Sequence, residues 1–125
     1  MKQKIETNNA PSAIGPYSQA IKTNHAVYFS GQIPLDPKTM TLISNDFAAQ
    51  AAQVMANLQA VSIAAGGSLD AIVKLTVYLT DLSHFPIFNE IMMQFFKAPY
   101  PARTTIQVSA LPKAAAIEVD AIMAL

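Results

Sequence analysis

Within residues 72–80, apolar and polar side chains alternate from Val73 onward, and this pattern constrains the fold more than any other part of the sequence. Such alternation is typical of a strand with one face buried and the other open. Apolar side chains recur at helical spacing on both sides of this segment, from Phe47 to Ala65 and from Phe85 to Phe96. A strand between two amphipathic helices predicts an α+β fold, with the helices packed on one face of a mixed sheet. The strand side chains predicted to enter the core are Val73, Leu75, Val77 and Leu79.

The helix ends are marked by residues that favour helix termini. Asp46 is placed to cap the first helix, and Gly66 is placed to stop it. Ser83 is predicted to cap the second helix. Shorter strand patterns occupy residues 26–30 and two stretches near the end of the chain. The predicted order is strands, helix, strand, helix, strand, strand, within one domain covering residues 1–125.

The face of the sheet turned away from the helices is predicted to carry a sparse set of polar side chains. We assign to it Lys74, Thr76, Tyr78, Arg103, Thr105, Glu118 and Asp120. Charged residues make up only 13% of the chain, against about 25% in typical soluble domains. So few charges on a small domain indicate that part of its surface is buried against another chain. We expect this open face to form an oligomer interface.

Composition argues against several classes of protein. The chain has no cysteine, which excludes a disulfide scaffold, a cysteine zinc site and a thiol nucleophile. Its net charge is zero and it contains a single arginine, so nucleic acid is not an expected partner. No secretory signal or membrane-spanning pattern is visible, and a cytoplasmic location is expected. His25 and His84 are too few and too far apart in sequence to predict a metal site.

Arg103 and Glu118 are the two residues whose chemistry stands out, and each has two interpretations. Arg103 is the only arginine, and its planar fork suits a carboxylate ligand, but spacing alone also allows a structural salt bridge at a sheet edge. Glu118 lies between Ile117 and Val119, where a carboxylate needs a partner or a function. It could be a general acid or base with a raised pKa, or a partner for Arg103 or Lys74.

Four other candidates carry weaker signals. Ser30 and Gly31 lie at a strand end, and Tyr17 follows a Gly-Pro step. Asn89 is a polar residue among the aromatic residues of the second helix. A serine without a positioned histidine is not an activated nucleophile. Residues alone therefore predict a small oligomeric α+β protein with a possible Arg/Glu site, and they do not choose a reaction.

Five motifs occur in order along almost the whole chain. They are Ala10-Pro11 with Ile14–Gln19, Phe29–Pro34, Ile72–Leu82, Pro101-Ala102-Arg103, and Leu111-Pro112-Lys113 with Ile117–Asp120. Together they resemble the RidA/YjgF family of enamine and imine deaminases. The resemblance runs from about Ala10 to Ala124.

This resemblance implies a chorismate-mutase-like fold that assembles as a homotrimer, with ligand sites in the clefts between subunits. It implies hydrolysis of 2-aminoacrylate, 2-iminopropanoate or 2-iminobutanoate to 2-oxo acids and ammonia. Such intermediates escape from PLP-dependent dehydratases and damage other PLP enzymes. The implied partners are a small imine, enamine or 2-oxo acid and further copies of the chain. No cofactor, metal, nucleic acid or membrane is implied.

The resemblance also assigns roles to particular residues. Arg103 would bind the substrate carboxylate, and Glu118 would position or activate the hydrolytic water. The remaining pocket residues would be Tyr17, Ser30, Gly31, Asn89 and Thr105. Thr105 stands where many members have a cysteine, so it keeps a hydroxyl but no thiol. The alternative function is a trimeric module that binds 2-oxo acids without turnover, which would need Arg103 but not Glu118.

Overall fold

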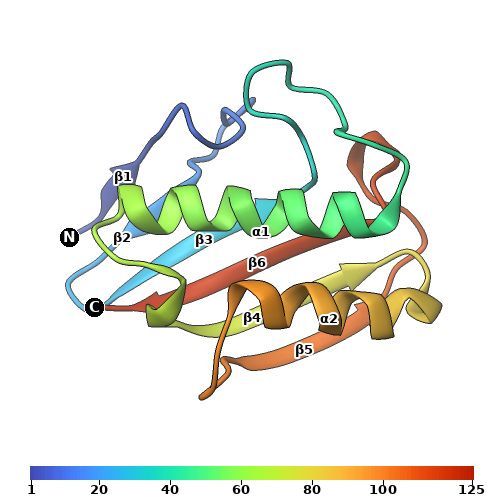
Figure 1. Cartoon of the computed structure of the whole chain (residues 1–125). Coiled ribbons are helices and arrows are strands. Elements are labelled where there is room, and N and C mark those ends of the chain that lie inside the picture. Colours follow the sequence, from blue (N-terminus) through green and yellow to red (C-terminus); the bar gives the residue numbers. More distant parts are fainter.

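A six-stranded mixed sheet organises the computed structural model, which describes residues 1–125. The strands are β1 (Gln3–Ile5), β2 (Ala20–Lys22), β3 (Ala26–Gln32), β4 (Ile72–Leu79), β5 (Ala102–Gln107) and β6 (Ile117–Ala124). They lie in the order β1-β2-β3-β6-β4-β5 (Figure 1). Only the β4–β5 pair is parallel, because its crossover contains a helix. Strand β5 is therefore an edge strand.

Both helices lie on the same face of the sheet, as Figure 1 shows. They are α1 (Phe47–Ala64) and α2 (Phe85–Phe95), and short 3-10 turns lie at Leu69–Ala71, Leu82–His84 and Pro112–Ala114. The apolar stripe predicted for the first helix is buried along its full length. This arrangement confirms the predicted α+β fold with two helices on one face. Neither helix has the combination of length and apolar character needed to cross a membrane.

Two buried polar residues of α1 connect the helix to the loops around the sheet. The Gln50 side chain donates to the Ser44 carbonyl at 2.9 Å and accepts from the Ala116 amide at 2.8 Å. Asn57 donates to the Leu35 carbonyl at 3.2 Å. Each side chain satisfies a main-chain group that would otherwise be buried without a partner. The bond to Ala116 fixes the segment that leads into β6, and the other two bonds fix the loop between β3 and α1.

One of the two residues predicted to cap the start of a helix is confirmed, and the other is not. Asp46 caps α1, since its carboxylate accepts from the Ala49 amide at 2.9 Å. Ser83 does not cap α2, and that prediction is wrong. Asp81 instead accepts from the Ser83 amide at 2.9 Å and starts a 3-10 turn, after which α2 begins without a side-chain cap. A carboxylate two residues upstream is the stronger acceptor for the free amides.

The prediction is also wrong for one residue of the central strand. Val73 was predicted to enter the core, but it is 48% exposed. A register shift between Ile72 and Lys74 places Ile72 in the core instead. A bulge inserts one residue into the alternation, and side-chain period alone does not reveal it. The rest of the strand keeps the predicted alternation, with Leu75, Val77 and Leu79 buried.

Arg103 and Thr105 lie on the helix side of the sheet, so their predicted placement on the open face is wrong. Arg103 is paired with Leu75 and Thr105 with Val77 in the β4–β5 register, and both partners are fully buried beneath the helices. Paired residues of neighbouring strands point to the same face. Alternation shows which residues share a face but not which face the helices cover. The open face instead carries Thr104 and, 42% exposed, Ile106.

Candidate functional site

Arg103 is held at the edge of the sheet by neutral groups. Its Nη1 donates to Asn89 Oδ1 at 2.8 Å and to Met92 Sδ at 3.3 Å. Its guanidinium carbon lies 5.0 Å from the ring centre of Phe85 and 5.7 Å from that of Phe88. Burial lowers the pKa of Arg103 from its ordinary value, but a guanidinium remains charged at any physiological pH. The side chain is thus oriented and partly desolvated while still cationic.

No acidic side chain forms an ion pair with this arginine. The two ion pairs of the chain are Lys4–Glu6 at 3.2 Å and Lys97–Asp70 at 3.9 Å, both exposed. The interpretation of Arg103 as a structural salt bridge within the chain is therefore not supported. A half-buried cation without an anion is suited to bind a carboxylate from outside.

A cavity of about 580 Å³ opens beside Arg103. Its walls are formed by Asn89, Met92, Met93, Tyr100, Pro101 and Arg103. The cavity lies between α2 and the segment that enters β5, so the guanidinium faces a space with mainly apolar walls. Such a space suits a small ligand with one carboxylate and a short apolar remainder.

Glu118 lies on the opposite face of the sheet. Its neighbours Ile117 and Val119 are fully buried beneath the helices, so Glu118 itself points to the open face. Its carboxylate lies against Gly31 of β3, where a Cβ atom would overlap it. Burial raises the pKa of Glu118, and the negative charge of Asp120 raises it further. No hydrogen bond or ion pair stabilises this carboxylate, which favours an acid–base role over a structural one.

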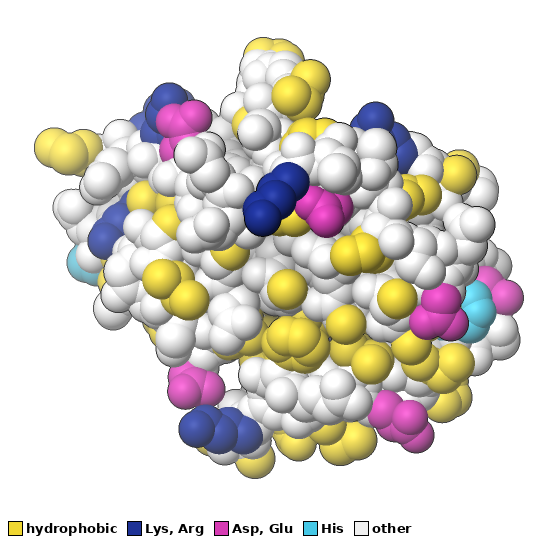
Figure 2. Space-filling model, turned by 45° about the horizontal axis from the view of Figure 1, so that its top comes forward, with side chains coloured by type: hydrophobic (Ala, Val, Ile, Leu, Met, Phe, Trp, Pro, Cys, Tyr) yellow, Lys and Arg dark blue, Asp and Glu magenta, His cyan; other side chains and the backbone are white.

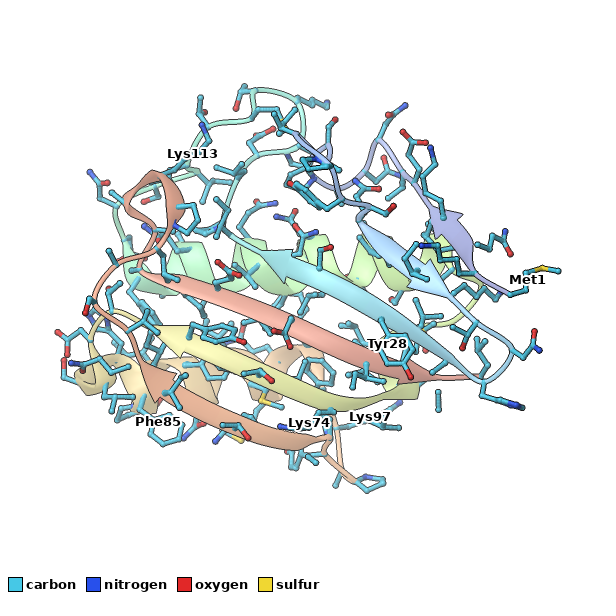
Figure 3. All side chains as sticks on the ribbon, turned by 180° about the vertical axis from the view of Figure 1, so that it is seen from behind. Met1, Tyr28, Lys74, Phe85, Lys97 and Lys113 are labelled. Carbon is cyan, nitrogen blue, oxygen red and sulfur yellow. The ribbon has the colours of Figure 1, made fainter.

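Tyr17 and Gly31 share a second cavity of about 320 Å³. Tyr17 is 53% exposed, and its hydroxyl accepts a hydrogen bond from the Ile14 amide at 3.3 Å. Lys113, labelled in Figure 3, also lines this cavity. Ser30 directs its hydroxyl to the Ser18 carbonyl, so it holds the segment that carries Tyr17. Tyr17, Ser30, Gly31 and Glu118 thus form one local group.

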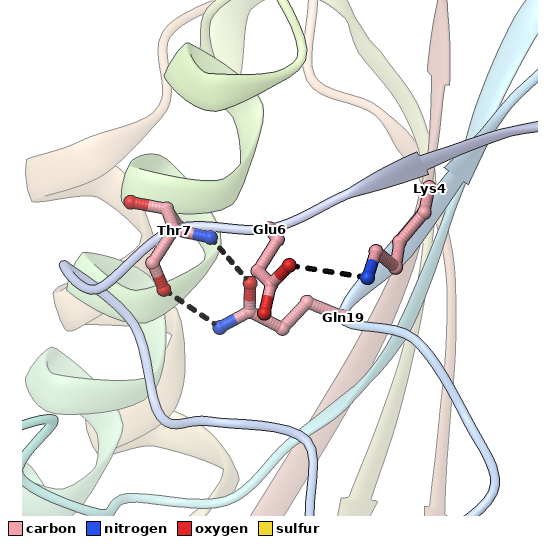
Figure 4. Close-up of polar contacts among 4 residues, drawn as sticks. All are labelled: Lys4, Glu6, Thr7 and Gln19. Atoms are coloured by element: carbon pink, nitrogen blue, oxygen red, sulfur yellow. Dashed lines mark hydrogen bonds and ion pairs between the residues drawn. The ribbon is translucent and has the colours of Figure 1, made fainter.

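Gln19 supports this group, although sequence reasoning gave it no role. Its buried side chain donates to the carbonyls of Thr7 and Pro11 at 3.0 and 2.7 Å and accepts from the Thr7 amide at 2.7 Å. Figure 4 shows the bonds to Thr7 beside the exposed Lys4–Glu6 pair. A buried amide that ties two chain segments together rigidifies both. Glutamine is a polar residue, so the sequence did not predict that the Gln19 side chain is buried, with an exposed fraction of only 3%.

Thr105 lies on the same strand face as Arg103, two residues further along β5. Its Oγ1 is buried and has no hydrogen-bond partner in the chain.

His84 Nδ1 is also buried and unpartnered, and the His84 ring stacks on the Phe47 ring with 4.3 Å between the ring centres. The structure gathers no group of three or more histidine, cysteine, aspartate or glutamate side chains that could hold a metal ion.

The predicted site residues therefore form two groups within one chain. The first, called here the arginine half-site, is Arg103 with Asn89 and the adjacent cavity. The second, the glutamate half-site, is Glu118 with Tyr17, Ser30 and Gly31. The two lie on opposite faces of the sheet, with β4 between their strands. One chain does not bring Arg103 and Glu118 together.

Comparisons with known proteins match this chain over nearly its whole length. A family model described as Endoribonuclease L-PSP (Ribonuc_L-PSP) matches residues 7–125. A human protein named 2-iminobutanoate/2-iminopropanoate deaminase is 43% identical over 122 residues, covering 98% of this chain and 89% of that protein. A RutC family protein of Pyrococcus horikoshii is 47% identical over 122 residues, covering 98% of this chain and 97% of that protein.

The structural comparison agrees. The crystal structure of RidA from an Antarctic Psychrobacter superposes with a TM-score of 0.95 at 49% identity, covering 98% of this chain and 99% of that one. These relatives differ in how specific their names are, because the RutC name states no reaction.

Proposed function

The chain belongs to the RidA/YjgF family, and from this premise we propose that it hydrolyses reactive imines and enamines to 2-oxo acids and ammonia. The substrates would be of the 2-aminoacrylate, 2-iminopropanoate and 2-iminobutanoate type. The observation that carries the proposal is Arg103, a partly desolvated guanidinium with no acidic partner, facing a cavity of suitable size. The human relative named as such a deaminase supports the choice of reaction. We propose a cytoplasmic location, where PLP-dependent dehydratases would supply the substrate.

We propose that the working site forms between copies of the chain, in a homotrimer. Arg103 and Glu118 cannot meet within one chain, so a site that uses both needs the arginine half-site of one copy and the glutamate half-site of another. Strand β5 is an edge strand and can approach a neighbouring copy. The open face of the sheet carries exposed apolar side chains, including Tyr28 at 51%, labelled in Figure 3, and, by its position in β5, Ile106 at 42%. Burying these residues would account for the low charge content of the chain.

The proposed hydrolysis requires only water and proton transfer. The guanidinium of Arg103 holds the substrate carboxylate by two hydrogen bonds and fixes the adjacent imine carbon. Water attacks the carbon of the N-protonated imine while Glu118 accepts one of the water's protons, which gives a neutral carbinolamine. Glu118 then returns that proton to the amino nitrogen and the C–N bond breaks. As ammonia leaves and the carbonyl forms, the hydroxyl proton passes to Glu118 and from there to ammonia. The net change is protonated imine plus water to 2-oxo acid plus ammonium.

A second function is favoured by one of the structural neighbours. The crystal structure of Escherichia coli TdcF with bound serine is 42% identical, with a TM-score of 0.94, and the match covers 98% of each chain. That structure shows a relative holding an amino acid. The alternative is therefore a trimeric module that binds 2-oxo acids or related carboxylates without turnover. Ligand binding by such a module would depend on Arg103 and would not depend on Glu118.

Recognition of RNA has less support. Lysine and arginine side chains are scattered over the face seen in Figure 2 and form no continuous basic surface there. The chain also has no net charge. Binding to the phosphate backbone depends on concentrated positive charge.

The test uses 2-aminoacrylate generated in situ by a serine or threonine dehydratase, with 2-oxo acid release followed against the uncatalysed rate. Arg103→Ala should raise KM and lower kcat/KM by about 10²-fold or more, because the carboxylate loses its anchor. Glu118→Gln should lower kcat by about 10²-fold or more, because proton transfer is lost. Lys97→Ala removes an exposed cation outside both half-sites and serves as the control. An inactive wild-type protein whose melting temperature rises with a 2-oxo acid through Arg103 would establish the binding module instead.

A further inference from the structure

A second carboxylate, that of Asp120, lies on the same face of β6 as Glu118. Glu118 and Asp120 point to the same side of β6, two residues apart. In the β4–β6 register, Tyr78 is the partner of Glu118 and Thr76 is the partner of Asp120. The Tyr78 hydroxyl crosses to Asp120 and donates to its Oδ2 at 3.0 Å. The phenol thus fixes the second carboxylate beside the first.

We propose that Asp120, oriented by the Tyr78 hydroxyl, is a positioning residue that makes Glu118 a stronger proton acceptor. The inference rests on the proposed function, in which Glu118 moves a proton between water and the leaving amine. A fixed negative charge close to a half-buried carboxylate disfavours its ionised form. A base whose proton affinity lies closer to the working pH accepts and returns a proton more effectively.

The titration behaviour of Glu118 and Tyr78 agrees with this geometry. Burial raises the pKa of Glu118 most, and the charge of Asp120 adds to the rise. The pKa of Tyr78 is also raised, chiefly because its hydroxyl donates to Asp120 and also through burial and the charges of Asp120 and Glu118. Asp120 therefore raises the pKa of both Glu118 and Tyr78.

No cation of the same chain neutralises the carboxylate pair. Lys74 is on this face, but its amine donates to Thr104 Oγ1 at 2.9 Å, on the β5 side and away from β6. On β3, the neighbours of Glu118 are the uncharged Ser30 and Gly31, and Tyr28 lies opposite Ile122. Lys113 lines the cavity next to Gly31 and forms no ion pair. Within one chain, Asp120 is thus the charged group that raises the pKa of Glu118.

The chain is well suited to a direct measurement, because it contains only three glutamates, Glu6, Glu90 and Glu118. Protein labelled with ¹³C at the glutamate carboxyl should give three side-chain signals, and Glu118→Gln identifies the one that disappears. The chemical shift of Glu118 is followed against pH in wild type, Asp120→Asn and Asp120→Glu. Glu6 and Glu90 report any general change in the protein. Asparagine preserves the shape of Asp120 and can still accept from Tyr78, so the fold should be kept.

We expect the Glu118 titration to move to lower pH in Asp120→Asn and to return toward the wild-type position in Asp120→Glu. The acid limb of the pH profile of kcat should move in the same direction, and kcat near neutral pH should fall about 3- to 10-fold. Glu6→Gln removes an exposed acid and should change neither. A Glu118 titration that is unchanged in Asp120→Asn would overturn the inference. If the titration moves but wild type releases no 2-oxo acid, the proposed function fails while the coupling between Asp120 and Glu118 stands.

Discussion

The arginine and glutamate half-sites differ in the groups that contact their charges. Arg103 contacts groups that attract a cation, namely an amide oxygen, a thioether sulfur and two aromatic faces. Glu118 has no hydrogen-bond donor or cation of its own chain beside it, and the carboxylate of Asp120 repels its charge. Burial disfavours both charges, but the cation is oriented by its contacts, whereas the anion is left without a partner. The first environment suits recognition of a ligand, and the second suits proton transfer.

This difference bears directly on the choice between deaminase and binding module. A protein that only binds 2-oxo acids has a use for the arginine half-site but gains nothing from a destabilised carboxylate. A charged Glu118 in these surroundings lowers the stability of the fold, and this cost is expected where the carboxylate takes part in catalysis. Substitutions that disturb one half-site at a time should therefore separate binding from turnover.

Among substitutions that leave Arg103 and Glu118 in place, the largest effect is expected from Gly31→Ala in the glutamate half-site. The added Cβ would overlap the Glu118 carboxylate. Because the overlap involves the end of a flexible side chain, Glu118 can move away at little cost to the fold. A displaced base is poorly placed for proton transfer, so kcat should fall about 10²-fold while the melting temperature changes little. Steady-state kinetics and thermal unfolding measure the two quantities.

A double variant tests whether Gly31 acts through Glu118. If it does, adding Gly31→Ala to Glu118→Gln should cause little further loss of kcat, because the interaction has already been removed. Independent losses that multiply in the double variant would show that Gly31 serves another purpose, such as a main-chain contact to the ligand.

A smaller effect is expected from Asn89→Asp in the arginine half-site. The new carboxylate would lie where Asn89 Oδ1 now accepts from Arg103 at 2.8 Å, so it would compete with the substrate for the guanidinium. KM should rise about 10-fold, kcat should change less, and the fold should be retained because the half-buried guanidinium gains a partner. Gln94→Glu adds the same charge at an exposed position of α2 and is the matched control. An unchanged KM would mean that Arg103 does not bind the substrate carboxylate.

Sequence predicted those parts of the fold that are set by local interactions. The stripe of α1 and its Asp46 cap follow from spacing and from one side chain reaching three residues ahead. The bulge at Val73 and the face occupied by Arg103 depend on pairing with distant strands. Residue types therefore identified Arg103 and Glu118 as chemically unusual but placed both on one face of the sheet. Their separation into two half-sites follows only from the order and register of β4, β5 and β6.

Supporting residues were harder to predict than the charged ones. Phe88 and Met92 are ordinary core residues by spacing, yet one lies beneath the Arg103 guanidinium and the other accepts its hydrogen bond. Tyr78 was expected on the open face and is there, but its bond to Asp120 depends on the antiparallel register. An apolar stripe shows that side chains are buried and does not show which polar group they surround.

The smallest expected effect is on the stability of the fold, and it comes from the charge of Glu118 in the glutamate half-site. Burial and Asp120 raise the pKa of Glu118 in the fold, so the native state binds its proton more tightly than the unfolded chain does. Stability is then unaffected below the unfolded pKa of about 4.3 and decreases as pH rises from there through the folded pKa. Glu118→Gln should accordingly raise the melting temperature at neutral pH, and the gain should vanish below about pH 4. Glu6→Gln, at a side chain 70% exposed, should give no such gain. Thermal unfolding from pH 3 to pH 8 measures both variants against wild type, and a Glu118→Gln protein less stable than wild type at neutral pH would show that the charge is stabilised in the fold.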